Sequence, residues 1–320
     1  MKMEPIPGRG GMQSEAQHEE IWLLGQPPLQ AYLDFVEDMV TVRPAPARAA
    51  LVDEWRAAND YYGELEEAEA GIADEAETLD LDPALRPLVA EVSADPRFRR
   101  AFDALPTRFA MVELDRLVVG HPYVSGHHIE RIRGQIGSAP TPEQLFRFCQ
   151  PLDRDEAAVQ VRKTGPRSYL FWSPSSDFRY QETELLRADQ VSYEPIGPLG
   201  GMIGVMVGFG SNFLTAIQSD NRLLLHNGHH RACALRAQGI THAPCIVQTV
   251  TRLDELRLVA GRAVLDDPAF YFRAKRPPLL KDFFDPRIRK VCPVRRMANA
   301  VEVTIEINEM KKIEDFSEEG

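Results

Sequence analysis

The chain has 320 residues and a formal net charge of −11. This length fits one large domain or two modest ones, and 44% apolar with 27% charged residues excludes disordered, collagen-like and coiled-coil proteins. The charge is uneven: residues 1–107 carry 22 acidic and 9 basic side chains, whereas residues 252–296 carry 6 acidic and 12 basic ones. The acidic balance argues against a protein that binds nucleic acid with its whole surface.

Neither the cysteines nor the apolar stretches point to secretion or to a membrane. The four cysteines form no CxxC pair and no small secreted framework, so we expect reduced thiols. The first residues lack the apolar core of a signal peptide. Residues 199–217 are apolar but contain five glycines, which favours buried strands joined by a turn over a membrane span. We therefore expect a cytoplasmic protein without membrane contact.

The N-terminal third is acidic and shows helical periodicity. Residues 1–20 are polar and rich in glycine, which is typical of a disordered tail. Apolar residues then recur at helical spacing, as at Leu33, Val36 and Val40. We predict an acidic all-helical domain over residues 21–107. It contains no nucleotide loop and no metal motif, so its expected role is to cover the core or to bind a protein partner.

From residue 108 onward, strand and helix patterns alternate, which predicts an α+β core over residues 108–250. Residues 251–320 should form a basic segment and a C-terminal strand that pack on this core. The expected elements are strands at 109–114, 222–225, 243–250 and 301–307, a hairpin at 157–172, and helices at 129–136 and 229–238.

Candidate functional side chains are most concentrated in residues 223–239. There, a predicted strand leads through Asn227-Gly228 into a predicted helix that begins His229-His230-Arg231. A helix N-terminus offers unpaired N–H groups and a partial positive charge. Gly228 permits a tight turn, and an arginine in the first turn can clamp a phosphate or carboxylate. The pattern predicts an anion site made by Asn227, Gly228, His229 and Arg231. It also fits a plain strand–turn–helix joint whose polar residues only cap the helix.

Residues 222–247, RLLLHNGHHRACALRAQGITHAPCIV, resemble the signature half of the ParB/sulfiredoxin-like superfamily, which includes the ParB-like nuclease domain. There, a strand, a Gly-x-x-Arg turn, an alanine-rich helix, a glycine turn and a strand follow one another. Gly228, Arg231 and Gly239 stand at matching positions, and VELDRL at 112–117 resembles the opening of that fold. The resemblance covers about residues 108–250, with an insertion at about 137–200. It implies a mixed-sheet core preceded by the helical domain.

The resemblance also implies that a nucleotide phosphate binds at the Gly-x-x-Arg turn. Members include partition proteins that bind and hydrolyse CTP, nucleases, a free-serine kinase and the enzyme that repairs over-oxidised peroxiredoxin. The repair enzyme needs a cysteine where this chain has His229, and the Asn-x-x-Arg motif of the partition proteins is missing. The kinase needs a carboxylate near the first strand, for which Glu113 and Asp115 are positional candidates.

A second group of histidines, His121, His127 and His128, lies in the loop after the first strand of the core. In the resembling fold this loop faces the phosphate turn, so one of them is a candidate general base. The alternative, which we favour, is a surface loop with incidental histidines. His226, His229 and His230 do not share one helix face, so we expect no transition-metal site. Mg²⁺ held mainly by a bound phosphate is the favoured ion.

Together these observations predict an enzyme for phosphoryl transfer or nucleotide hydrolysis. Its expected ligand is a nucleoside triphosphate or diphosphate with Mg²⁺, or another phosphorylated small molecule, and its expected catalytic residues are His128, His229, His230 and Arg231. One alternative is a nucleic-acid-binding protein or nuclease that uses the basic segment 252–296. We favour instead that this segment pairs its charge with the acidic front. Another alternative is a non-catalytic scaffold that binds a partner through the helical domain.

Overall fold

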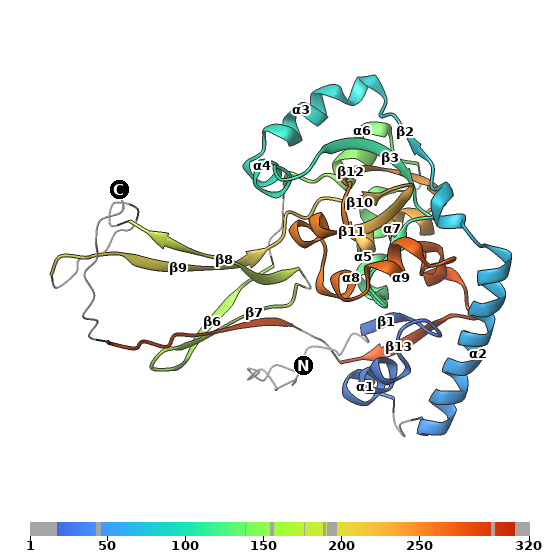
Figure 1. Ribbon diagram of the computed structural model, residues 1–320, viewed down its shortest axis with the longest axis horizontal. Coiled ribbons are helices and arrows are strands. Elements are labelled where there is room, and N and C mark those ends of the chain that lie inside the picture. Colours follow the sequence, from blue (N-terminus) through green and yellow to red (C-terminus); the bar gives the residue numbers. More distant parts are fainter. Residues whose placement is uncertain are drawn as a thin grey trace. The chain divides into compact units, whose positions relative to one another are not determined.

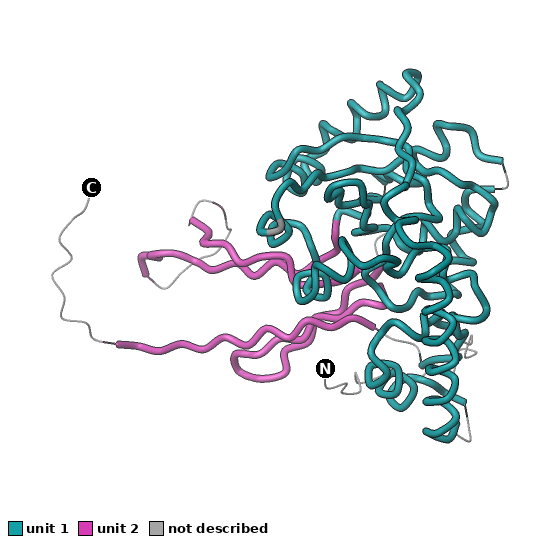
Figure 2. Tube along the Cα trace, turned by 45° about the vertical axis from the view of Figure 1, so that its right-hand side comes forward, with its two compact units in different colours: residues 1–154, 211–296 teal, residues 155–210, 297–320 magenta. Residues whose placement is uncertain are grey.

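The computed structural model describes residues 18–42, 46–137, 139–153, 157–175, 177–187, 190, 197–295 and 298–310. The chain is a mixed α+β protein, as predicted, and forms two compact units (Figure 2). Unit 1 consists of Met1–Arg154 and Ser211–Arg296, and unit 2 of Asp155–Gly210 and Met297–Gly320. Each unit is therefore built from two separate stretches of the chain. No helix in the described parts is both long and apolar enough to cross a membrane.

The core of unit 1 is a six-stranded sheet with the strand order β2-β3-β12-β10-β11-β4 (Figure 1). β10 and β12 are parallel, as are β11 and β4, whereas the other neighbours are antiparallel. The strands are β2 (Thr78–Leu79), β3 (Thr107–Glu113), β4 (Val118–Val119), β10 (Thr215–Ser219), β11 (Arg222–Asn227) and β12 (His242–Val250). The predicted strands at 109–114, 222–225 and 243–250 are thus confirmed.

Three helices pack on this sheet, α5 (Gly126–Ile136), α6 (Pro142–Cys149) and α7 (His229–Ala237). Two of them, α5 and α7, carry residues of the candidate site. α5 buries Ile129, Ile132 and Ile136, and α7 buries an alanine-rich face in the same apolar cluster. Because apolar residues three and four apart share one helix face, both helices turn that face to the sheet.

A second, three-stranded sheet in unit 1 has the order β13-β1-β5. Its strands are β1 (His18–Leu23), β5 (Tyr123–Ser125) and β13 (Arg289–Val294). Two helices pack beside it, α1 (Leu29–Met39) and α2 (Arg48–Ala68). The ring of Trp22 on β1 stacks on Phe35 of α1 at 4.3 Å and on Tyr123 of β5 at 5.2 Å between ring centroids. β1 begins within the predicted tail, and residues 1–17 lie outside the described residues.

Shorter helices complete unit 1. The α-helices are α3 (Arg86–Ala94), α4 (Pro96–Ala101), α8 (Arg262–Asp266) and α9 (Pro268–Arg273). The 3₁₀ helices are η1 (Ile72–Glu75), η2 (Pro83–Leu85), η4 (Leu253–Leu258) and η5 (Leu280–Phe284). The acidic front shares unit 1 with the sheet, rather than forming the separate helical domain that we predicted.

Unit 2 consists of two small antiparallel sheets. One has the order β14-β7-β6 and the other pairs β8 with β9. The strands are β6 (Gln160–Gly165), β7 (Ser168–Ser173), β8 (Phe178–Leu186), β9 (Met202–Phe209) and β14 (Asn299–Thr304). The predicted hairpin is confirmed as β6–β7. The C-terminal strand, which we expected to pack on the core, pairs with β7 of the insertion instead.

Candidate functional site

The N-terminus of α7 follows a turn whose backbone conformation and close packing require glycine at residue 228. Gly228 has φ +91°, and a Cβ atom there would lie 3.1 Å from the Cα atom of Leu214. The Gly228 N–H donates a hydrogen bond of 2.9 Å to Oδ1 of Asn227. No side chain of the described residues caps the helix. α7 therefore presents the positive end of its dipole without a side-chain acceptor, which is the end of a helix that favours an anion.

His229, the first residue of α7, is buried with 8% of its surface exposed. Its Nε2 atom has no hydrogen-bond partner among the described residues. Its ring meets that of His121 edge-on, with 4.7 Å between ring centroids. Burial lowers the pKa of His229 well below its usual value, so the ring is neutral near pH 7. A neutral ring with Nε2 protonated has one donor available for a ligand.

His230, the next residue, is fixed by the backbone of β5. Its Nε2 atom accepts a hydrogen bond of 3.0 Å from the Ser125 N–H, so the proton of the neutral ring is on Nδ1. Burial lowers the pKa of His230 to about 3, and the nearby charges act in the same direction. Ser125 also caps α5, because its Oγ atom accepts a hydrogen bond from the His128 N–H.

His128 and Arg231 lie beside this ring. The ring of His128 meets that of His230 with 4.8 Å between centroids. Burial lowers the pKa of His128 to about 4, assisted by the positive charges of Arg131 and Arg231. Arg231 Nη1 donates a hydrogen bond of 2.5 Å to the carbonyl oxygen of Asn212. A guanidinium held at the backbone and close to two neutral histidines can stabilise negative charge.

The structure thus brings together every residue of the predicted site. Asn227, Gly228, His229, His230 and Arg231 form one turn, and the histidine loop reaches it through the two ring contacts. We favoured a surface loop with incidental histidines, but His121 and His128 contact the histidines of the turn. His127 contacts His18 of β1 instead, with 5.0 Å between ring centroids.

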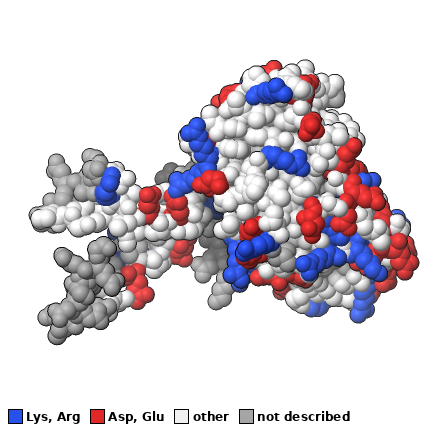
Figure 3. All heavy atoms as spheres, turned by 45° about the horizontal axis from the view of Figure 1, so that its top comes forward, with Lys and Arg blue, Asp and Glu red and all other residues white. Residues whose placement is uncertain are grey.

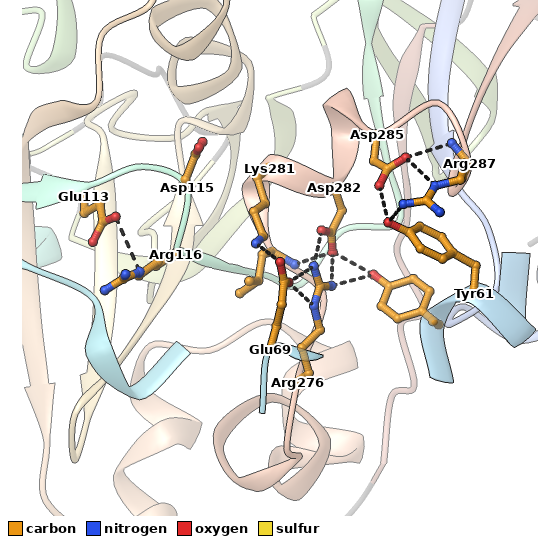
Figure 4. Close-up of polar contacts among 12 residues, drawn as sticks. Tyr61, Glu69, Glu113, Asp115, Arg116, Arg276, Lys281, Asp282, Asp285 and Arg287 are labelled. Carbon is orange, nitrogen blue, oxygen red and sulfur yellow. Dashed lines mark hydrogen bonds and ion pairs between the residues drawn. The ribbon is translucent and has the colours of Figure 1, made fainter. Parts of the chain in front are cut away.

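The two carboxylates that we considered for a kinase mechanism are engaged elsewhere, Asp115 with Arg236 and Glu113 with Arg116 (Figure 4). Glu113 forms an ion pair with Arg116 at 3.5 Å. Asp115 forms one with Arg236 at 2.6 Å, near the other end of α7. Neither carboxylate is therefore available as a base at the turn without first losing its partner.

The sequence pattern did not identify two residues that lie next to the candidate site, Glu20 and Ser125. Glu20 on β1 lies opposite Ser125 in the β1–β5 register and is 7% exposed. Burial raises its pKa to about 7, against the effect of a hydrogen bond with Ser125. Ser125 therefore connects a buried carboxyl group to the backbone contact of His230. Only the pairing of β1 with β5 reveals this link.

The basic segment makes its contacts within unit 1. Arg276 binds Glu69 at 3.1 Å, Lys281 binds the same carboxylate at 2.6 Å, and Lys290 pairs with Glu54 of α2. These contacts agree with the expected pairing of the segment with the acidic front (Figure 4). Figure 3 shows acidic and basic side chains interspersed over the face in view. This arrangement does not favour a nucleic-acid surface on that face.

In the part of the chain that the structure describes, no three His, Cys, Asp or Glu side chains form a group that could hold a metal ion. Comparisons with family models, curated proteins and solved structures find no match for the chain. What the site can bind therefore follows from its own geometry.

Proposed function

We propose that the protein binds the phosphate of a nucleotide, or of another phosphorylated small molecule, at the N-terminus of α7 in a ParB/sulfiredoxin-like core. The observation that carries this proposal is the buried Nε2 atom of His229, which has no partner among the described residues, at a helix N-terminus that no described side chain caps. Leaving a buried polar atom unpaired costs roughly 1–3 kcal/mol. A bound phosphate oxygen would accept from this donor and complement the helix dipole.

The reaction that fits this arrangement best is phosphoryl transfer or nucleotide hydrolysis. Arg231 would stabilise the charge that develops on the transferred group. His128 would act as the acid–base group, whereas His230, whose Nε2 atom accepts from the Ser125 N–H, would donate a hydrogen bond to the phosphate from Nδ1. Burial keeps His128 neutral near pH 7, and the negative charge of a phosphate would raise its pKa.

A nucleoside triphosphate or diphosphate would bring Mg²⁺ to the site on its own phosphates. The described residues offer no carboxylate set that would hold the ion without them. The four buried, unpaired cysteines favour a reducing compartment, and we place the activity in the cytoplasm. The nucleic-acid alternative has less support, because key basic side chains of its segment are already paired.

Titration calorimetry with nucleoside triphosphates, diphosphates and inorganic phosphate, each with Mg²⁺, tests the proposal. We expect the wild type to bind one of them. Arg231→Ala should weaken this binding roughly ten- to a hundredfold, because a charged hydrogen bond is worth about 1.5–3 kcal/mol. Arg236→Ala is the matched control, since Arg236 is on the same helix but pairs with Asp115. No binding by the wild type, or equal binding by wild type and Arg231→Ala, would refute the proposal.

A further inference from the structure

The outer strands of unit 2 differ in how their edges are protected. Within the described residues, β6 and β14 are the outer strands of one sheet, and β8 and β9 each have one unpaired edge in the other. Proteins commonly place charged residues on such edges, because an uncharged edge pairs readily with another strand. Charged side chains occur on three of the four strands: Arg162 and Lys163 on β6, Arg179, Glu182 and Glu184 on β8, and Glu302 on β14. β9, with the sequence MIGVMVGF, has none.

β9 also contributes to an apolar face of its hairpin. Ile203, Val205 and Val207 alternate along the strand and so point to one face. Ile203 lies directly opposite Leu185 of β8, and both side chains are 73% exposed. A two-stranded ribbon is only marginally stable in water. The open edge of this hairpin would gain backbone hydrogen bonds from a further strand, whose side chains would pack beside those of the apolar face.

We propose that unit 2 is a dimerisation element, in which β9 pairs antiparallel with β9 of a second copy of this chain. An identical strand has the same length, is equally uncharged and carries apolar residues on the matching face. A two-fold axis perpendicular to the sheet would join the apolar faces of both copies on one side of a four-stranded sheet. The charged β8 strands would then form its outer edges, where charge prevents further addition.

We place Met206 on the two-fold axis, near the middle of β9 (Met202–Phe209). This register places Gly204 of one copy opposite Gly208 of the other, and Val205 opposite Val207. The two Met206 Cα atoms would then lie about 4.5–5.5 Å apart, as in any antiparallel pair. That distance lies within the span of about 4.4–6.8 Å that a disulfide bridges.

The association state of the full chain tests the proposal. In sedimentation velocity we expect a dimer for the wild type and a monomer for Ile203→Lys, because the new charge would lie on the paired edge. Val161→Lys is the matched control: Val161 is 58% exposed on β6, so this variant should remain dimeric. Under mild oxidation, Met206→Cys should form an intermolecular disulfide, whereas Val161→Cys should not.

Three results would overturn the proposal. One is a monomeric wild type, including one that associates only with a different protein. Another is a dimer that Ile203→Lys leaves intact or that Val161→Lys disrupts to the same extent. The third is cross-linking of Val161→Cys as efficient as that of Met206→Cys.

Discussion

Unit 1 contains two arginine-centred clusters that differ in how completely their polar atoms are paired. Around Arg276, which is 1% exposed, both Nη atoms donate to Asp282 at 2.6 Å. Tyr62 donates to the same carboxylate at 2.7 Å, and Glu69 accepts from Arg276 at 3.1 Å (Figure 4). Around Arg231, by contrast, a buried histidine nitrogen has no partner among the described residues and the helix lacks a side-chain cap.

The difference separates a structural cluster from a candidate binding site. A buried charge network is stable only when its members are satisfied by one another, and the Arg276 cluster meets this condition. It joins α2 to the segment that carries η5. The turn at α7 instead has a buried ring nitrogen without a partner among the described residues, which is the condition that a ligand can relieve. Charge and arginine content alone would not distinguish the two.

The largest effect should come from breaking the saturated cluster. Arg276→Met leaves the carboxylate of Asp282 buried without its main partner, which typically costs about 3–5 kcal/mol of unfolding free energy. Urea unfolding followed by circular dichroism measures this loss. Arg252→Met is the control, because its ion pair with Asp254 is exposed, and its unfolding midpoint should not move. Equal effects of both changes would show that the buried cluster is not a structural requirement.

A smaller effect should come from the turn itself. Gly228→Ala and Gly239→Ala both force a side chain into the left-handed region, at φ +91° and +82°, which costs about 1–2 kcal/mol. Only at residue 228 would the new Cβ atom also crowd Leu214, which adds roughly 1–3 kcal/mol. In thermal unfolding, Gly228→Ala should therefore have a lower melting temperature than Gly239→Ala. Only the former should weaken phosphate binding, and the opposite ranking would contradict the close approach at the turn.

The smallest effect should be a dependence of stability on pH. Between its usual pKa of 6.5 and its folded-state pKa of about 3, His230 takes up a proton in the unfolded chain but not in the folded one. The unfolding free energy should therefore decrease as pH falls below 6.5, by up to about 2 kcal/mol at pH 5. Glu20, whose pKa is raised to about 7, acts in the opposite direction over pH 4.5–7.

The contribution of His230 is isolated by comparing the wild type with His230→Gln in urea at pH 7 and pH 5. The variant should lose less stability on acidification than the wild type. His242→Gln serves as the control, because the His242 ring contacts Glu77 at the surface, away from the turn. If His230→Gln and the wild type lost the same amount, the histidine would not be buried as a neutral group.

The local part of the site could be predicted from sequence. The strand, glycine turn and helix over Arg222–Ala237 follow from hydrophobic pattern and from Asn227-Gly228, because neighbours along the chain determine them. The loop histidines were expected at the turn only through the superfamily resemblance. The ring contact of His128 with His230 confirms their proximity.

Pairing between distant segments could not be predicted. Glu20 lies within a stretch that reads as a polar tail, and nothing in its local pattern shows that β1 pairs with Ser125. The alternating stretch at 301–307 predicts a strand correctly, since β14 covers Asn299–Thr304, but not that it pairs with β7. Register over such separations depends on cross-strand packing, which a single sequence does not display.

The position of β1 between β5 and β13 has a consequence for synthesis on the ribosome. His18 pairs with Val294, so the first described strand acquires one neighbour only after nearly the whole chain has been made. Contacts of such long sequence separation form late, because the loop between them must first be closed. Until then the β1–β5 pair, which includes the Ser125 backbone that holds His230, has an open edge. A nascent chain thus cannot complete the framework of its histidine site before its C-terminal region has emerged.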